Sequence, residues 1–174
     1  MNLGGANKGK RMQAKSAYGK TALKIGVVAL ILIVVLLNLF THVFMVVRYY
    51  GDGMEPTLSN RQILILLKTD EVEQGDITAF YYNNKVLVRR VICEGGRTLS
   101  IDKAGRVYIN DELLDEPYVK QPSMGQCNVG FPHNVSVGQF FVMGDNRAVA
   151  MDSRLTEIGS ISADRIIGKV ILVI

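Results

Sequence analysis

The sequence predicts a mainly β domain, built from antiparallel sheets, that follows one N-terminal transmembrane helix. Three observations lead to this fold class. An apolar run of 23 residues, Ile25 to Val47, comes early in the chain. Beyond it stand short runs of β-forming residues separated by turn residues, and no amphipathic segment of ten or more residues. The 174 residues leave room for one globular core after the membrane segment.

The apolar run is long enough to cross a membrane. As a helix it reaches roughly 35 Å, against about 30 Å for the hydrocarbon core of a bilayer. A cleaved signal peptide is the alternative. However, the run is longer than the apolar region of a signal peptide, which usually has about 7 to 15 residues, and no small-x-small cleavage site follows it. The predicted organisation is a basic tail over 1–24, a transmembrane helix over 25–47 and a globular domain over 49–174.

Charge is divided unevenly along the chain. Seven basic residues and no acidic one precede Tyr49, whereas the rest holds 13 basic and 16 acidic residues. Six of the early cations stand before the apolar run and only Arg48 flanks its other end. This bias predicts a plasma-membrane protein with a cytoplasmic N-terminus and an extracellular C-terminal domain. The acidic balance of that domain disfavours a nucleic-acid partner.

The strand candidates follow in order after Tyr50. They are Ile63 to Leu67, Ile77 to Tyr82, Val86 to Ile92, Thr98 to Ile101, Arg106 to Ile109, Phe140 to Met143 and Ile166 to Ile174. Gly, Asn and Asp separate them, as at Gly75-Asp76, Asn83-Asn84 and Asn110-Asp111. Pro117 to Val137 has no regular pattern and is predicted to be a long loop.

Cysteine and histidine place few constraints on function. Cys93 and Cys127 lie in the predicted external domain, where a disulfide is permitted, yet their sequence does not tell whether they pair. His42 and His133 are far apart and there is no CxxC pair, so neither a metal site nor a cofactor is predicted.

Five sequence blocks follow one another in the predicted domain: GDGMEPTL (Gly51 to Leu58), GDITAF (Gly75 to Phe80), RRVI (Arg89 to Ile92), VYINDELLDEPYV (Val107 to Val119) and GDNRAVAMDSR (Gly144 to Arg154). In type and in order they resemble the sequence blocks of type I signal peptidases. The resemblance implies a β fold with a hydrophobic groove facing the membrane. It also implies action on the signal peptides of exported proteins, which the family cuts after small side chains.

The chain departs from the family pattern at three positions. Gly53 stands where the resemblance places the serine nucleophile, and Arg89 where it places the lysine general base. Ala150 replaces the serine that orients this lysine. Glycine has no oxygen to attack with, and an arginine is not usefully deprotonated in a protein. From these departures we expect no catalytic residues at these positions and a protein that is not an enzyme.

Other motif residues match the family and are expected to be structural: Pro56, Thr57, Asp145, Asn146, Arg147, Asp152, Ser153 and Arg154. Asp152 and Arg154 are suited to a charge-assisted pair. The expected peptide groove contains Asp52, Gly53, Met54, Arg89 and Arg90. Arg89 itself is predicted either to bind a carboxylate or peptide carbonyl or to be a solvated strand residue.

The main functional hypothesis is a membrane-anchored peptide-binding or chaperone-like factor. The chain resembles the catalytically inactive, SipA-type signal-peptidase-like proteins of streptococci and related Gram-positive bacteria. That resemblance implies a role in pilus assembly, with a pilin precursor or another signal-peptide-bearing exported protein as partner, and a sortase nearby. The alternative is an active type I signal peptidase with displaced groups, using Lys85, Lys103 or Lys120 as the amine beside a serine. A structural subunit without a peptide groove is the third possibility.

Overall fold

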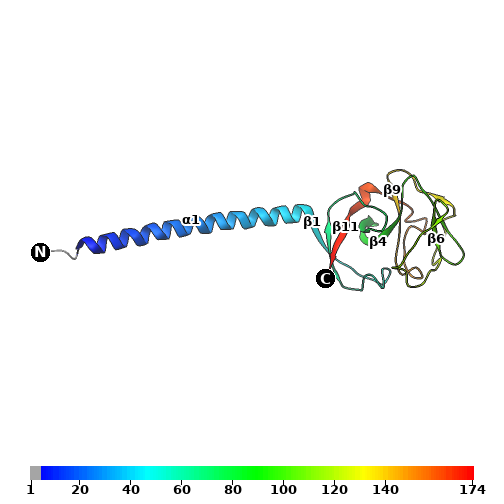
Figure 1. The fold of residues 1–174 in the computed structure, drawn as a ribbon, viewed down its shortest axis with the longest axis horizontal. Helices are drawn as coiled ribbons and strands as arrows, with labels where there is room; N and C mark the ends of the chain where they lie inside the picture. The colour runs from blue at the N-terminus through cyan, green and yellow to red at the C-terminus, as the bar shows by residue number, and fades with distance from the viewer. Residues whose placement is uncertain (1–4) are drawn as a thin grey trace. The chain divides into compact units, whose positions relative to one another are not determined.

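The structure, a computed structural model, describes residues 5–174, with side chains from residue 23 onward. A long helix, α1 (Gly5–Val43), precedes a β-rich unit that begins at Phe44 (Figure 1). Every paired strand of this unit is antiparallel to its neighbours. The predicted fold class, mainly antiparallel β with one N-terminal apolar helix, is therefore confirmed.

Within α1, the apolar segment Leu23–Val43 has the character of a membrane span. It has 21 residues, an 18-residue window of it has a mean hydropathy of 2.8, and none of the side chains in that window is buried within the protein. At 1.5 Å per residue it measures roughly 32 Å, which matches the hydrocarbon core of a bilayer. The helix also extends back to Gly5, through the predicted basic tail; residues 1–4 of that tail lie outside the described part of the chain.

The helix ends at Val43, four residues before the predicted boundary of the transmembrane segment. Phe44–Arg48 forms strand β1 instead, and it pairs with β2 so that Phe44 lies opposite Leu67. An apolar run of uniform composition does not reveal where a helix gives way to a strand, because long-range pairing decides the boundary.

The larger sheet has seven strands in the order β1-β2-β11-β3-β4-β9-β10. Besides β1, its members are β2 (Ile63–Leu67), β3 (Ile77–Tyr82), β4 (Lys85–Glu94), β9 (Gln139–Met143), β10 (Ile161–Ser162) and β11 (Ile166–Val173). A short 3-10 helix, η1 (Ala163–Arg165), links the last two strands. Strand β1 lies at one edge of this sheet and β10 at the other.

The smaller sheet has four strands in the order β7-β6-β5-β8. They are β5 (Thr98–Ile101), β6 (Val107–Ile109), β7 (Glu112–Leu113) and β8 (His133–Asn134). Two-residue turns join β3 to β4 and β6 to β7, and both residues of each turn have positive φ, at 43° and 61° for Asn83 and Asn84 and 50° and 68° for Asn110 and Asp111. Asn and Asp tolerate this left-handed backbone, which explains why these pairs mark hairpin turns in the sequence.

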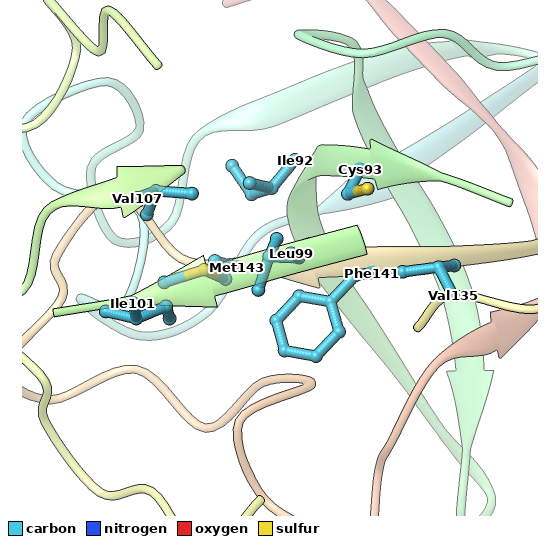
Figure 2. Close-up of a cluster of buried hydrophobic side chains, with 8 residues drawn as sticks. All are labelled: Ile92, Cys93, Leu99, Ile101, Val107, Val135, Phe141 and Met143. Atoms are coloured by element: carbon cyan, nitrogen blue, oxygen red, sulfur yellow. The ribbon is translucent and has the colours of Figure 1, made fainter. Parts of the chain in front are cut away.

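The main hydrophobic core lies between the two sheets. Figure 2 shows its eight buried side chains, which come from β4, β5, β6, β9 and the segment after β8: Ile92, Cys93, Leu99, Ile101, Val107, Val135, Phe141 and Met143. The unit has two further clusters of buried hydrophobic side chains. Successive side chains of a strand point to opposite faces of the sheet, so the neighbouring residues Ala79 and Phe80 of β3 belong to different clusters. Cys93 and Cys127 are both free thiols, so the open question of a disulfide is answered in the negative for this structure.

Candidate functional site

A groove of about 530 Å³ lies where three segments meet. These are the end of β1 with the loop that follows it, the first half of β4, and the loop after β9. Its lining residues are Val47, Arg48, Tyr49, Tyr50, Gly51, Asp52, Gly53, Lys85, Val86, Leu87, Val88, Arg89, Val149 and Met151. The groove therefore contains Asp52, Gly53 and Arg89, three of the five residues predicted for it.

Gly53, Arg89 and Ala150 are immediate neighbours at this groove. A Cβ atom added to Gly53 would lie 3.2 Å from Nη2 of Arg89 and 3.4 Å from Cβ of Ala150. These are the three positions at which the sequence departs from the family pattern. The fold brings them together from distant segments, because Gly53 and Ala150 lie in different loops, 97 residues apart in the sequence. The guanidinium lies against the position that a side chain at residue 53 would occupy.

Arg89 is held in place by carbonyl oxygens. Its Nε donates to the Met151 carbonyl at 2.8 Å and its Nη1 to the Val88 carbonyl at 2.6 Å. Only 7% of the residue is exposed, which excludes the solvated strand residue that the sequence allowed. Burial lowers the pKa of Arg89, and the charge of nearby Asp152 opposes this effect. An arginine begins from a pKa above about 12, so the group is a cation at neutral pH.

Two of the predicted groove residues lie elsewhere. Arg90 follows Arg89 on β4, and successive side chains of a strand point to opposite faces of the sheet. Arg90 accordingly packs over the Tyr118 ring, 4.0 Å from its centroid, and donates to the Gly75 carbonyl. Met54 is fully buried in the cluster that includes Leu58. Its neighbours in the sequence line the groove, but its side chain fills the core.

The residues expected to be structural form a buried polar network. Asp145 accepts two hydrogen bonds from Arg90, at 2.9 and 2.6 Å, and another from the Thr57 hydroxyl. Arg154 and Asp152 are both fully buried and form a two-point ion pair, with both contacts at 2.8 Å. Such forked pairs satisfy buried charges and fix the orientation of both side chains.

The same loop positions the backbone of Gly53. The Asn146 backbone N–H donates to the Gly53 carbonyl, and its side-chain amide donates to the Asp52 carbonyl, both at 3.1 Å. The Ser153 hydroxyl is fully buried and accepts the Val142 backbone N–H at 3.0 Å. It therefore serves as a structural hydrogen-bond acceptor and is closed to a substrate.

Glu116 and Tyr118 were not singled out from the sequence, although both belong to one of the five quoted blocks. Glu116 forms a two-point ion pair with the buried Arg147, with one contact at 2.9 Å, and accepts the Tyr118 hydroxyl. Arg147 also donates to the Gly144 carbonyl at 3.1 Å. The sequence offered no guide to this pairing, because an ion pair between residues 31 positions apart is set by the fold.

A second hollow, of about 730 Å³, adjoins this network. It is lined by Glu55, Pro56, Ser59, Lys120, Gln121, Pro122, Ser123, Asp145, Asn146, Arg147 and Ala148. Two serines and one of the three lysines considered for displaced chemistry thus share one hollow. Lys85 lies instead at the groove of Gly53, and Lys103 is exposed and lines neither hollow.

Comparison with known proteins places this architecture in a family. The model of the signal peptidase family, peptidase S26, matches residues 22–174. Signal peptidase I S of Bacillus subtilis is 35% identical over 138 residues, which cover 71% of this chain and 74% of the relative. Signal peptidase I T of the same organism is 35% identical over 153 residues, covering 79% and 78%. This chain belongs to the signal peptidase family.

More distant relatives include signal peptidase I of Streptococcus pneumoniae, which is 28% identical over 162 residues, covering 71% of this chain and 78% of the relative. A signal peptidase I from Enterococcus faecalis has a crystal structure that covers 59% of this chain and 97% of its own, with 26% identity and a TM-score of 0.49. The family assignment and the apolar helix together make this chain a single-pass membrane protein.

These comparisons contradict the expectation that the chain is not an enzyme. The relatives at 28 to 35% identity are named signal peptidase I, which is an enzyme. That expectation was based on three side chains at one site, whereas the family assignment is based on most of the chain. The prediction that the chain resembles type I signal peptidases is confirmed.

Proposed function

We propose that this protein takes the signal peptides of exported proteins as its substrates and binds them in extended form in the groove beside Gly53 and Arg89. The observation that carries the proposal is that this groove is assembled from three of the sequence blocks that match the family. Substrate binding in such a groove depends on its walls and edges and does not require a nucleophile.

The groove is bordered by an edge strand with which an extended peptide can pair. Strand β1 is an edge of the larger sheet, and its last residues, Val47 and Arg48, line the groove. Within the described part of the chain β1 pairs only with β2. An edge strand presents unpaired backbone N–H and C=O groups, which a bound peptide in β conformation can use.

The rim of the groove suits an apolar ligand. Tyr50, Val149 and Met151 line it and are 68%, 53% and 49% exposed. Exposed large apolar side chains that gather at one site indicate a surface that another apolar body covers. Signal peptides carry an apolar segment of 7 to 15 residues, and they lie at the membrane in which this chain is anchored.

The activity that the relatives' names support is cleavage of the bound signal peptide. Residue 53 supplies no hydroxyl for it, so the attacking group must come from elsewhere. The hollow that Ser59, Ser123 and Lys120 share is where the chain places serine hydroxyls and a lysine amine together. The Lys120 side chain is exposed, in contrast to the apolar surroundings that favour a neutral lysine. A cleavage assay therefore has to include variants at this hollow.

The proposal also includes the orientation of the chain in the membrane and a particular kind of exported protein as substrate. The six cations before the apolar segment support a cytoplasmic N-terminus and an extracellular β unit at the plasma membrane. The resemblance of the sequence to pilus-assembly proteins favours a pilin precursor, assembled beside a sortase, among the exported proteins.

Binding and cleavage are tested together on the full chain in detergent. A fluorescent precursor peptide that carries a signal peptide is expected to bind, and a scrambled peptide is expected to bind at least tenfold more weakly. Met151→Glu places a charge at the groove rim and should weaken binding. Leu113→Glu, at a side chain that is 59% exposed and lines a different hollow, is the matched control.

Mass spectrometry of the same mixtures reports cleavage. A product that ends after a small residue and disappears in Ser59→Ala or Ser123→Ala would assign the attacking hydroxyl. Equal affinity for the precursor and its scrambled control would refute the proposed groove.

A further inference from the structure

Arg89 is a buried cation without an ionic partner in the part of the chain whose side chains the structure describes. The other three arginines of the site, Arg90, Arg147 and Arg154, are each paired with a carboxylate. Arg89 forms no such ion pair with any described residue, although only 7% of it is exposed. Buried arginines are ordinarily paired, because removing a charge from water is costly.

The nearby carboxylate is already committed to another group. Asp152 is the acid whose charge acts most strongly on Arg89. Its two oxygens, however, accept two hydrogen bonds from Arg154 at 2.8 Å, and one also accepts the Gly144 backbone N–H at 2.9 Å. Asp152 therefore lowers the cost of burying Arg89 without forming a direct pair with it.

The guanidinium keeps donors for a ligand. It has five N–H groups; the Met151 and Val88 carbonyls take one each, and the Tyr49 side chain also hydrogen-bonds with the guanidinium. The Nη2 edge lies 3.2 Å from the point where a Cβ of residue 53 would stand. Residue 53 is glycine, and its lack of a side chain leaves room for the guanidinium itself at the groove, which both residues line.

The other charges of the groove also favour an anionic ligand. Among the described residues that line it, Arg48, Lys85 and Arg89 are basic and Asp52 alone is acidic. A groove with a cationic excess attracts an anion, and a planar guanidinium edge matches a carboxylate with two parallel hydrogen bonds. A peptide supplies a carboxylate either at its free C-terminus or on an Asp or Glu side chain.

We infer that the Arg89 guanidinium forms a carboxylate-binding subsite within the peptide groove. The inference rests on the proposed function only in taking the ligand to be a peptide. At this subsite the chain recognises the charge of its ligand, whereas the apolar rim recognises its hydrophobic part. Gly53 and Arg89 act as a pair, because a Cβ at residue 53 would crowd Nη2, whereas glycine lets the guanidinium keep its place at the groove.

The test uses the full chain in detergent and peptides that differ only in one carboxylate. The first pair has a free C-terminal carboxylate or a C-terminal amide. The second pair is amidated and has Asp or Asn at one internal position. We expect one charged peptide to bind about tenfold more tightly than its neutral counterpart, as for a charge-assisted hydrogen bond in a buried site. Which pair shows the preference identifies the source of the carboxylate.

Variants assign the preference to Arg89. In Arg89→Gln the charged and neutral peptides should bind equally, and Arg89→Lys should retain part of the preference because it keeps the charge but loses the fork. Arg97→Gln, at an arginine that lines another hollow, is the matched control and should leave the preference unchanged. Unchanged circular dichroism of Arg89→Gln shows that the variant is folded.

A second arm needs no peptide. Acetate should raise the melting temperature of the parent more than acetamide does, and Arg89→Gln should abolish this difference. Equal binding of charged and neutral peptides together with no effect of acetate would overturn the subsite. Failure of every peptide to bind while acetate still stabilises the parent would count against the proposed function and leave the subsite supported.

Discussion

The close packing of Gly53 against Arg89 predicts that the two positions are energetically coupled. Gly53→Ala adds a Cβ that would lie 3.2 Å from Nη2 and 3.4 Å from Cζ of Arg89, and 3.4 Å from Cβ of Ala150. These separations are tighter than ordinary van der Waals contacts, so the guanidinium has to shift. The backbone at Gly53 does not have the positive φ of Gly51, so the substitution brings no backbone strain.

The magnitude follows from two opposing effects. Overfilling a packed site costs typically about 1–3 kcal/mol, and the flexible end of Arg89 places this case near 1–2 kcal/mol. Replacing glycine at a permissive backbone position stabilises by about 0.4–1 kcal/mol through the unfolded chain. We therefore expect Gly53→Ala to destabilise the parent by at most about 1.5 kcal/mol, and to stabilise an Arg89→Met variant, where the crowding is relieved.

The assay is a double-mutant cycle on the full chain in detergent. Urea unfolding of the parent, the two single variants and the double variant, followed by tyrosine fluorescence, gives a coupling free energy expected at about 1–2 kcal/mol. Arg89→Met removes the contacts of Arg89 with Met151 and Val88 both in the parent and in the Gly53→Ala variant, so those contacts cancel in the coupling free energy. A coupling free energy within 0.3 kcal/mol of zero, which is roughly the scatter expected for independent sites, would refute the packing argument.

Three further predictions concern the charged network, a buried thiol and the membrane orientation. Asp145→Asn removes the charged partner of the buried Arg90 and should destabilise the protein by about 3–5 kcal/mol, measured by urea unfolding. The control is Asp102→Asn, which removes an exposed ion pair with Arg106 and should leave the melting temperature nearly unchanged. Burial raises the pKa of Cys93 to about 11, so its thiol should react with iodoacetamide at pH 8 far more slowly than the partly exposed Cys127. Between pH 9 and about 11 the thiol loses its proton mainly in the unfolded chain, so the stability of the folded state should fall as the pH rises through this range. An equal fall in stability of a Cys93→Ala variant would contradict this cause. A protease added outside intact cells should digest the β unit and spare a tag at the N-terminus, and the reverse result would refute the orientation.

Much of the fold follows from local sequence signals, and the exceptions have physical causes. Runs such as Ile63–Leu67 and Ile77–Tyr82 are strands with the predicted bounds, because β-branched and aromatic residues stand between clear turn residues. Strand β1 was missed because its residues continue the apolar run of the helix. The two-residue strands β7, β8 and β10 leave too short a pattern to be recognised.

The site was predicted in part. Motif order located Gly53 and Arg89, which the structure brings together through the loop after β1 and strand β4. Arg90 was wrongly grouped with them, although strand alternation alone separates neighbouring residues to opposite faces. The pairing of Glu116 with Arg147 and the absence of an ionic partner for Arg89 within the described residues depend on long-range packing, which sequence spacing does not encode.

The central claim, that the groove beside Gly53 and Arg89 holds the signal peptide, is tested most directly by site-specific photo-crosslinking. A photoreactive residue placed at Met151, on the groove rim, should crosslink a bound precursor within its signal peptide. The same residue at Leu113, which is 59% exposed against 49% for Met151 but lines a different hollow, should not. Crosslinks of equal yield from both positions, or crosslinks only to the mature part of the precursor, would contradict the account.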